Sequence, residues 1–236
     1  RALELYRGLG DRAGEARATI IGGLLAEDGG DLERALALYR KAAHLAEAAG
    51  DETGIALAKN DIGYVSVLSG DLPSAMVALE EAVAIARRRD DRRSLAFALQ
   101  KLGFTRFERG EALGALDHLA ESISLFAELH WNNEIAHSLV AVAALSEQAG
   151  GAELAAVALA AVDTTMTAES TTLEVYTRGL YERTMAGAQR ALDRDTLEAA
   201  AERGRARAAK AMDDLAAALV TDVARALSAD RPAAPA

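Results

Sequence analysis

His44 is the first residue whose neighbours suggest acid–base chemistry. A histidine titrates near neutral pH and can act as a general base when a carboxylate orients it, and Glu33, Glu47 and Asp51 lie near His44 in the sequence. A His–Glu pair three residues apart is also ordinary on an exposed helix face, where it contributes about 0.2–0.5 kcal/mol. A catalytic base needs a positioned partner and a pocket as well. Since the sequence indicates neither, we interpret His44 as a surface residue.

A second cluster, HWNNEIAH at residues 130–137, contains a pair with metal-ligand spacing. Glu134 and His137 are three residues apart, as in the Glu-x-x-His motif of di-metal helix bundles. Such a site needs the motif twice, together with further carboxylates, and the chain has one copy. We therefore predict no metal site, no cofactor and no catalytic residue.

Two basic clusters are candidates for contacts with a partner. RRRDDRR at residues 87–93 could dock an acidic partner, and the run of Arg203, Arg205, Arg207 and Lys210 could contact a neighbouring domain or nucleic acid. The chain has 36 acidic against 26 basic residues and a net charge of -10, which argues against nucleic-acid binding. We interpret both clusters as solvated faces, with docking as the alternative.

The composition predicts a helical protein. Of its 236 residues 51% are apolar, only three are proline and none is cysteine. Much of the apolar content is alanine, which has the lowest cost in a helix and lets helices approach closely. No apolar run approaches the roughly 20 residues that span a bilayer. We therefore expect a soluble, cytoplasmic protein with no membrane association.

A sequence repeat organises most of the chain, and its period is the distance from Gly30 to Gly70. Glycines recur at this repeat offset, small residues follow five positions later, and a second small position lies seven positions before each glycine. The aligned positions are Gly30, Gly70, Gly110 and Gly150; Ala35, Ala75, Ala115 and Ala155; and Gly23, Gly63, Gly103 and Ala143. Each unit has the pattern helix, turn, helix, because Gly70 can close one helix while Asp71 caps the next and Pro73 fits its first turn.

This pattern resembles the tetratricopeptide repeat (TPR), in which small residues occur at the spacing of Gly63, Ala75 and Ala82. The resemblance implies an all-α, right-handed solenoid of TPR-like hairpins, and bulky residues at the small positions would overpack the helix contacts. We predict a tail helix of a truncated preceding repeat at 1–11, four hairpins at 12–164, closing helices at 165–228, and a disordered tail at 229–236.

The closing segment RALDRDTLEAAAERGRA, residues 190–206, together with the recurrent Gly-Asp turns, resembles the C-terminal repeat region of bacterial LuxR-type and related signal-transduction ATPases. That resemblance implies a nucleotide-binding domain upstream and a DNA-binding domain at one end of a longer chain. Neither is visible here, since the sequence contains no G-x-x-x-x-G-K-[ST] phosphate loop.

Three of the four phenylalanines share one predicted helix face, which in TPR proteins lines a concave groove. The face and its equivalents one repeat before and after comprise Asn60, Tyr64, Val67, Phe97, Gln100, Phe104, Phe107 and His137. Aromatic anchors with interspersed amides suit a peptide or small ligand. The alternative is that the phenylalanines pack between adjacent repeats.

These observations favour a noncatalytic interaction or effector-sensing module of a larger bacterial regulator. Its partners would be a protein or peptide, a small effector, or other domains of the same longer chain. A scaffold for homo-oligomerisation is the main alternative. A further alternative is an enzyme with a site between the last repeat and the closing helices, but the sequence offers no nucleophile with a neighbouring base.

Overall fold

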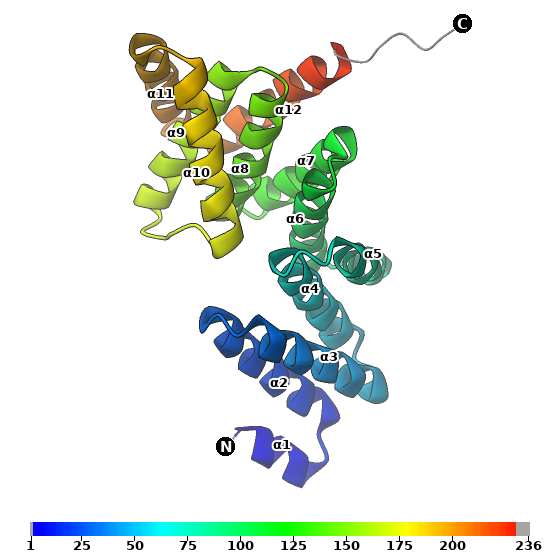
Figure 1. Cartoon of the computed structure of the whole chain (residues 1–236). Coiled ribbons are helices and arrows are strands. Elements are labelled where there is room, and N and C mark those ends of the chain that lie inside the picture. The colour runs from blue at the N-terminus through cyan, green and yellow to red at the C-terminus, as the bar shows by residue number, and fades with distance from the viewer. Residues whose placement is uncertain (1, 230–236) are drawn as a thin grey trace, which may run out of the picture. The chain divides into compact units, whose positions relative to one another are not determined.

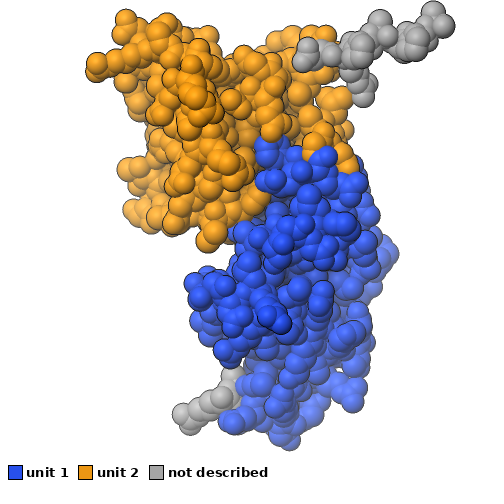
Figure 2. Space-filling model, in the orientation of Figure 1, with its two compact units in different colours: residues 1–109 blue, residues 110–236 orange. Residues whose placement is uncertain are grey.

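A computed structural model of the chain describes residues 2–229. Every regular element in this part of the chain is an α-helix, as the sequence predicted. The chain divides into two compact units, residues 1–109 and residues 110–236 (Figure 2).

The first unit is a series of antiparallel helices, each packed on its neighbours (Figure 1). Its helices are α1 (Ala2–Leu9), α2 (Arg12–Asp28), α3 (Leu32–Ala49), α4 (Glu52–Leu68), α5 (Leu72–Arg88) and α6 (Arg92–Glu108). Helices α2 and α3 form one hairpin and α4 and α5 the next, while α3 packs on α4 and α4 packs on α6. This is the stacking of helical hairpins in an α-solenoid.

Turns with left-handed backbone divide the first unit into helices at regular intervals. Positive φ values occur twice in each repeat, at Gly10, Gly30, Gly50, Gly70 and Asp90. In each case the next residue is an aspartate whose side chain accepts a hydrogen bond from the backbone N–H three residues later, as Asp31 does from Arg34 at 3.1 Å. Local signals therefore end one helix and start the next, because the turn residue satisfies the last carbonyls and the aspartate the first amides.

The small residues lie where the two helices of a hairpin meet, as predicted. A Cβ atom added to Gly63 would lie 2.4 Å from the Leu79 side chain, and Leu79 is fully buried. Ala75 and Ala82 on the facing helix are also buried. The hairpin α4–α5 is therefore close enough that glycine is required at position 63.

The second unit combines a helical hairpin with helices that cover it. Its helices are α7 (Ala112–Glu128), α8 (Asn132–Gln148), α9 (Ala152–Ala168), α10 (Val175–Ala191), α11 (Arg194–Ala208) and α12 (Met212–Ala229). Helix α10 packs on α8 and α9, α11 on α9, and α12 across α7 and α8. In Figure 1 the pair α10 and α8 can be followed side by side. The last three helices thus close the apolar faces of the α8–α9 hairpin.

The first three helix starts in the second unit depart from the aspartate pattern. The N-cap positions of α7, α8 and α9 are Glu111, Trp131 and Gly151; the first two side chains do not cap their helices, and Gly151 has no side chain that could. The Trp131 ring instead stacks on Phe126 of α7, with centroids 6.2 Å apart and an angle of 27° between the planes. Trp131 therefore packs into the link between α7 and α8.

The ends of two predicted segments can be placed against these helices. Helix α9 continues to Ala168, past the predicted limit of the hairpins at residue 164, and Ala229 is the last residue of α12. Residues 230–236 of the predicted tail lie outside the described residues. In the described part of the chain, no helix has the length and apolar character needed to cross a membrane.

Candidate binding surface

Helices α4 and α6 of the first unit border a cavity of about 380 Å³. Its lining comes from one stripe of α4 and from the first turns of α6, and comprises Thr53, Ala56, Leu57, Asn60, Asp91, Arg93, Ser94 and Phe97. Leu57 is 40% exposed and Phe97 is partly exposed. These two side chains are related by the repeat offset, so the repeat places an apolar group at the same position of each helix.

Asn60 brings an unsatisfied polar atom to this cavity. Its Nδ2 donates a hydrogen bond to Asp61 Oδ1 at 3.3 Å, while its Oδ1 is buried and has no hydrogen-bond partner among the described residues. A buried acceptor without a donor costs about 1–3 kcal/mol. A ligand N–H that reached Asn60 after a small side-chain rotation would remove that cost.

Asp91 holds the start of α6 at the rim of the cavity. Its carboxylate accepts hydrogen bonds from the Ser94 backbone N–H at 3.0 Å and from the Ser94 hydroxyl at 2.8 Å. Burial alone would raise the pKa of Asp91, but these bonds, with the nearby Arg89 and Arg93, outweigh it and lower the pKa. The carboxylate is therefore ionised at neutral pH and fixes the backbone that carries Phe97.

Five other residues of the predicted face are buried in the structure. They are Tyr64, Val67, Gln100, Phe104 and Phe107, each at most 8% exposed. Lys101 of α6 places its ammonium 4.3 Å from the centre of the Tyr64 ring, so that ring contacts the neighbouring helix. Side chains at this depth offer a partner no surface, and their burial favours the packing alternative. Of the residues predicted to form this face in the first unit, Asn60 and Phe97 are the ones that remain partly exposed.

His137 also differs from its predicted place on an open face. It is 5% exposed, and its Nδ1 is hydrogen-bonded to Thr177 Oγ1 of α10 at 2.9 Å. The closing helix therefore covers the face of α8 on which His137 lies. No group of three or more potential metal-binding side chains occurs within residues 2–229.

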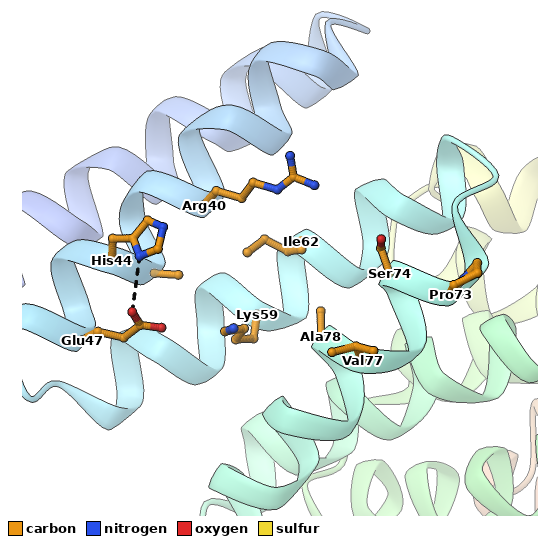
Figure 3. A pocket seen from close by; sticks show the side chains of 10 residues that line it. Arg40, His44, Glu47, Lys59, Ile62, Pro73, Ser74, Val77 and Ala78 are labelled. Atoms are coloured by element: carbon orange, nitrogen blue, oxygen red, sulfur yellow. Dashed lines mark hydrogen bonds and ion pairs between the residues drawn. The ribbon is translucent and has the colours of Figure 1, made fainter.

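A larger cavity, of about 510 Å³, is lined by α3, α4 and α5 (Figure 3). His44 lies at its edge with a side chain 81% exposed, and its Nδ1 lies 3.3 Å from Glu47 Oε2. The exposed position of His44 was predicted, whereas no pattern in the sequence indicates the cavity. Across it, Lys59 forms an ion pair with Glu81 at 2.6 Å.

The sequence contains a signal for part of the α4–α6 cavity. Leu57 and Thr53 precede Phe97 and Arg93 by the repeat offset, so the rule that related Asn60 to Gln100 would also have selected them. The α3–α5 cavity has no such signal, because its lining comes from three helices whose spacing depends on packing.

Comparisons with known proteins agree with this fold. No protein-family model and no curated protein sequence matches the chain. Among solved structures, the chain is similar to TPR-like repeats of a Podosopora anserina protein described as a putative kinesin light chain, with a TM-score of 0.52, 18% identity, and coverage of 82% of this chain and 95% of that one. A single-substitution variant of that protein matches equally well, with 94% of it covered. At this identity the likeness concerns the fold, and the chain is an all-α protein with a TPR-like repeat fold.

Proposed function

We propose that the chain is a noncatalytic protein-interaction module that binds a peptide segment in the cavity between α4 and α6. The observation that carries this proposal is the combination, in one 380 Å³ space, of the exposed Leu57 and the partly exposed Phe97 with the unpaired acceptor of Asn60. The TPR-like fold supports it, since stacked helical hairpins present extended binding surfaces.

The chemistry of the cavity favours an apolar side chain flanked by peptide backbone. Covering Leu57 and Phe97 removes apolar surface from water at about 25 cal/mol per Å². A backbone N–H can donate to Asn60, and the exposed Arg93 lies at the rim, where a charge governs orientation more than affinity.

A display selection of random peptides against the whole chain tests this proposal. Selected peptides should bind Phe97→Ala at least about tenfold more weakly, because an aromatic anchor at an interface typically contributes about 1–2 kcal/mol or more. Leu24→Ala, at a 42% exposed position on α2, is the matched control and should bind normally. Equal binding of both variants, or no peptide above background, would refute the proposed site.

Phe104 is unsuitable for the same test. It is 2% exposed, so Phe104→Ala should remove core packing and lower stability by about 3–5 kcal/mol. A loss of peptide binding in that variant would not separate binding from folding, whereas Phe97→Ala should unfold at nearly the normal temperature.

We further propose that this module belongs to a cytoplasmic bacterial transcriptional or signalling regulator of the LuxR-type or signal-transduction ATPase class. The support is the resemblance of residues 190–206 to the closing segment of that class. The gene that encodes the chain provides the test. A phosphate-binding loop and a DNA-binding domain in the same reading frame are the expected result, and a reading frame with neither would exclude this class.

Self-association is a second candidate function, and exposed apolar residues on α1 and α2 favour it. Leu5, Leu9, Ile21 and Leu25 are between 58% and 78% exposed, and large apolar side chains on a surface commonly mark contact sites. Light scattering across a concentration series measures the molar mass and so tests for self-association. A constant monomer mass would exclude the scaffold function, and a dimer lost in Leu9→Ser would support it.

A further inference from the structure

Two cavities of the first unit occupy equivalent positions in successive repeats. The 510 Å³ cavity is lined by α3, α4 and α5, and a second cavity of about 340 Å³ is lined by α1, α2 and α3. The lining residues correspond at the repeat offset, as in the pairs Leu3 and Ala43, Gly22 and Ile62, and Leu38 and Ala78. Helix α3 therefore forms a ridge with one cavity on each flank.

Each cavity has an apolar wall that is open to water. Leu25 lines the smaller cavity and is 69% exposed, and Val77 lines the larger one and is 59% exposed. Leu38 and Ile62 add apolar surface beneath them. Both spaces can accept an apolar side chain, since the sizes lie in the range of ordinary ligand pockets.

The α3 ridge carries three exposed cations without a counter-charge in contact. Arg34 and Lys41 line the smaller cavity and Arg40 the larger. Among the described residues, no side chain forms a hydrogen bond or ion pair with any of these three cationic groups. Figure 3 shows Arg40 extending from α3 toward the side on which Ile62 and Ser74 lie.

The residues that line the two cavities include more cations than acids. Glu47 is the acid among them, and Lys59 is paired with Glu81. Asp71 lies outside both linings; hydrogen bonds from Ser74 and the nearby Arg40 lower its pKa, so its carboxylate stays ionised and offsets part of the charge of Arg40. In a chain of net charge -10, the ridge is thus a local excess of positive charge that faces outward.

We infer that the α3 ridge is a second docking surface, whose occupant is an acidic amphipathic helix of another protein. Two apolar side chains of that helix enter the two cavities, and its carboxylates pair with Arg34, Arg40 and Lys41. A helix is about 10 Å across, so the two anchors must span a similar distance. Residues seven apart on a helix are about 10.5 Å apart along its axis, which gives the occupant an i, i+7 spacing of leucines with glutamates between them.

This surface is separate from the proposed peptide site. It is built mainly from α2, α3 and α5, whereas the peptide site is built from α4 and α6 and shares no lining residue with it. A partner could therefore occupy either without the other, and a failure at one says nothing about the other.

A synthetic helical peptide with leucines at i and i+7 and glutamates elsewhere is the probe, measured by fluorescence anisotropy on the whole chain. Saturable binding that weakens as salt rises from about 0.1 M to about 1 M is expected, since salt screens exposed charges. The same peptide with lysine for glutamate, and one with the leucines at i and i+5, should bind at least about tenfold more weakly. Equal binding of all three peptides would overturn the inference.

Two sets of variants identify the site. The triple variant Arg34→Gln/Arg40→Gln/Lys41→Gln should lose at least about tenfold in affinity, whereas Arg190→Gln/Arg194→Gln/Arg207→Gln, with the same change of charge at exposed residues of the second unit, should bind as the natural chain does. Leu25→Ser and Val77→Ser, both at exposed positions, should each weaken binding while the thermal unfolding temperature stays the same.

Two experimental outcomes would contradict the inference. If both triple variants bind the peptide alike, the attraction is not due to the ridge. If a DNA duplex of random sequence binds the natural chain, loses affinity in the ridge variant, and the acidic peptide does not bind at all, the ridge serves nucleic acid instead, and the inference is wrong. The binding of Phe97→Ala to the acidic peptide should remain normal, which keeps this test independent of the peptide site.

Discussion

Two adjacent glycines of α2 provide a sharp test of how the hairpins pack. A Cβ atom at Gly23 would lie 2.4 Å from Tyr39 Cε1, whereas a Cβ at Gly22 would meet only Leu38 Cδ1, at 3.8 Å. Tyr39 cannot move aside easily, because it is fully buried and its hydroxyl donates a hydrogen bond to Glu27 Oε2 at 2.8 Å. The same substitution at neighbouring positions should therefore have opposite effects.

The magnitude follows from two terms. Replacing glycine by alanine inside a helix stabilises it by about 0.8–1 kcal/mol, and this term is common to Gly22→Ala and Gly23→Ala. Overpacking of a well-packed contact costs about 1–3 kcal/mol and applies only at Gly23. The free energy of unfolding should therefore rise by about 1 kcal/mol in Gly22→Ala, and the two variants should differ by about 1–3 kcal/mol.

Urea unfolding followed by circular dichroism in the far ultraviolet measures both variants. A third protein, with Tyr39→Ala as background, supplies the control: without the ring, Gly23→Ala should become stabilising, because only the helix term remains. Equal stability of Gly22→Ala and Gly23→Ala in the natural background would show that α2 and α3 do not approach closely at Tyr39.

Three further predictions concern other contacts. Ala75→Leu, at a fully buried position, should lower stability by about 1–3 kcal/mol through overpacking, and an unchanged melting temperature would remove Ala75 from the helix contact. Thr177→Val should destabilise the second unit by about 1–3 kcal/mol in thermal unfolding, because it leaves His137 Nδ1 buried without its partner; a neutral result would show that α10 does not cover His137. The lowered pKa of Asp91 means that its contribution to stability is complete above its ordinary pKa of about 3.9 and is lost as the pH falls through the lower folded value. Asp91→Asn keeps the cap without the charge, so its stability should depend less on pH between about 2 and 5; an identical acid titration would contradict this.

The helices could be predicted from the sequence because the signals that start and end them are local. Gly70 and Asp71 act within a few residues of the chain, and the structure has the left-handed turn and the capping bond at these positions. The contact of Gly63 was also predictable, because a repeat that always has small residues at one place implies close helices there. The constant repeat offset carried both kinds of information.

The exposure of the aromatic face could not be predicted in the same way. Helical periodicity shows that Phe97 and Phe104 share a face, but it does not show which neighbours lie against that face, and the two residues differ in burial. His137 is the clearest example, because the helix that covers it begins at Val175, where the repeat pattern has ended. A repeat pattern contains no information about a segment that does not repeat.

The two cavities beside α3 show why a repeat can have a regular fold and still offer different surfaces. Equivalent positions line both cavities, yet Arg34 in one corresponds to Ser74 in the other, and Thr19 corresponds to Lys59. Backbone spacing is set by the small buried residues, which vary little between repeats because overpacking is costly. Exposed positions carry no such constraint, so charge can differ from one repeat to the next at small cost in stability. Binding specificity in this chain should therefore depend on the exposed residues of individual repeats, which is why the ridge variants change charge alone and leave every buried contact intact.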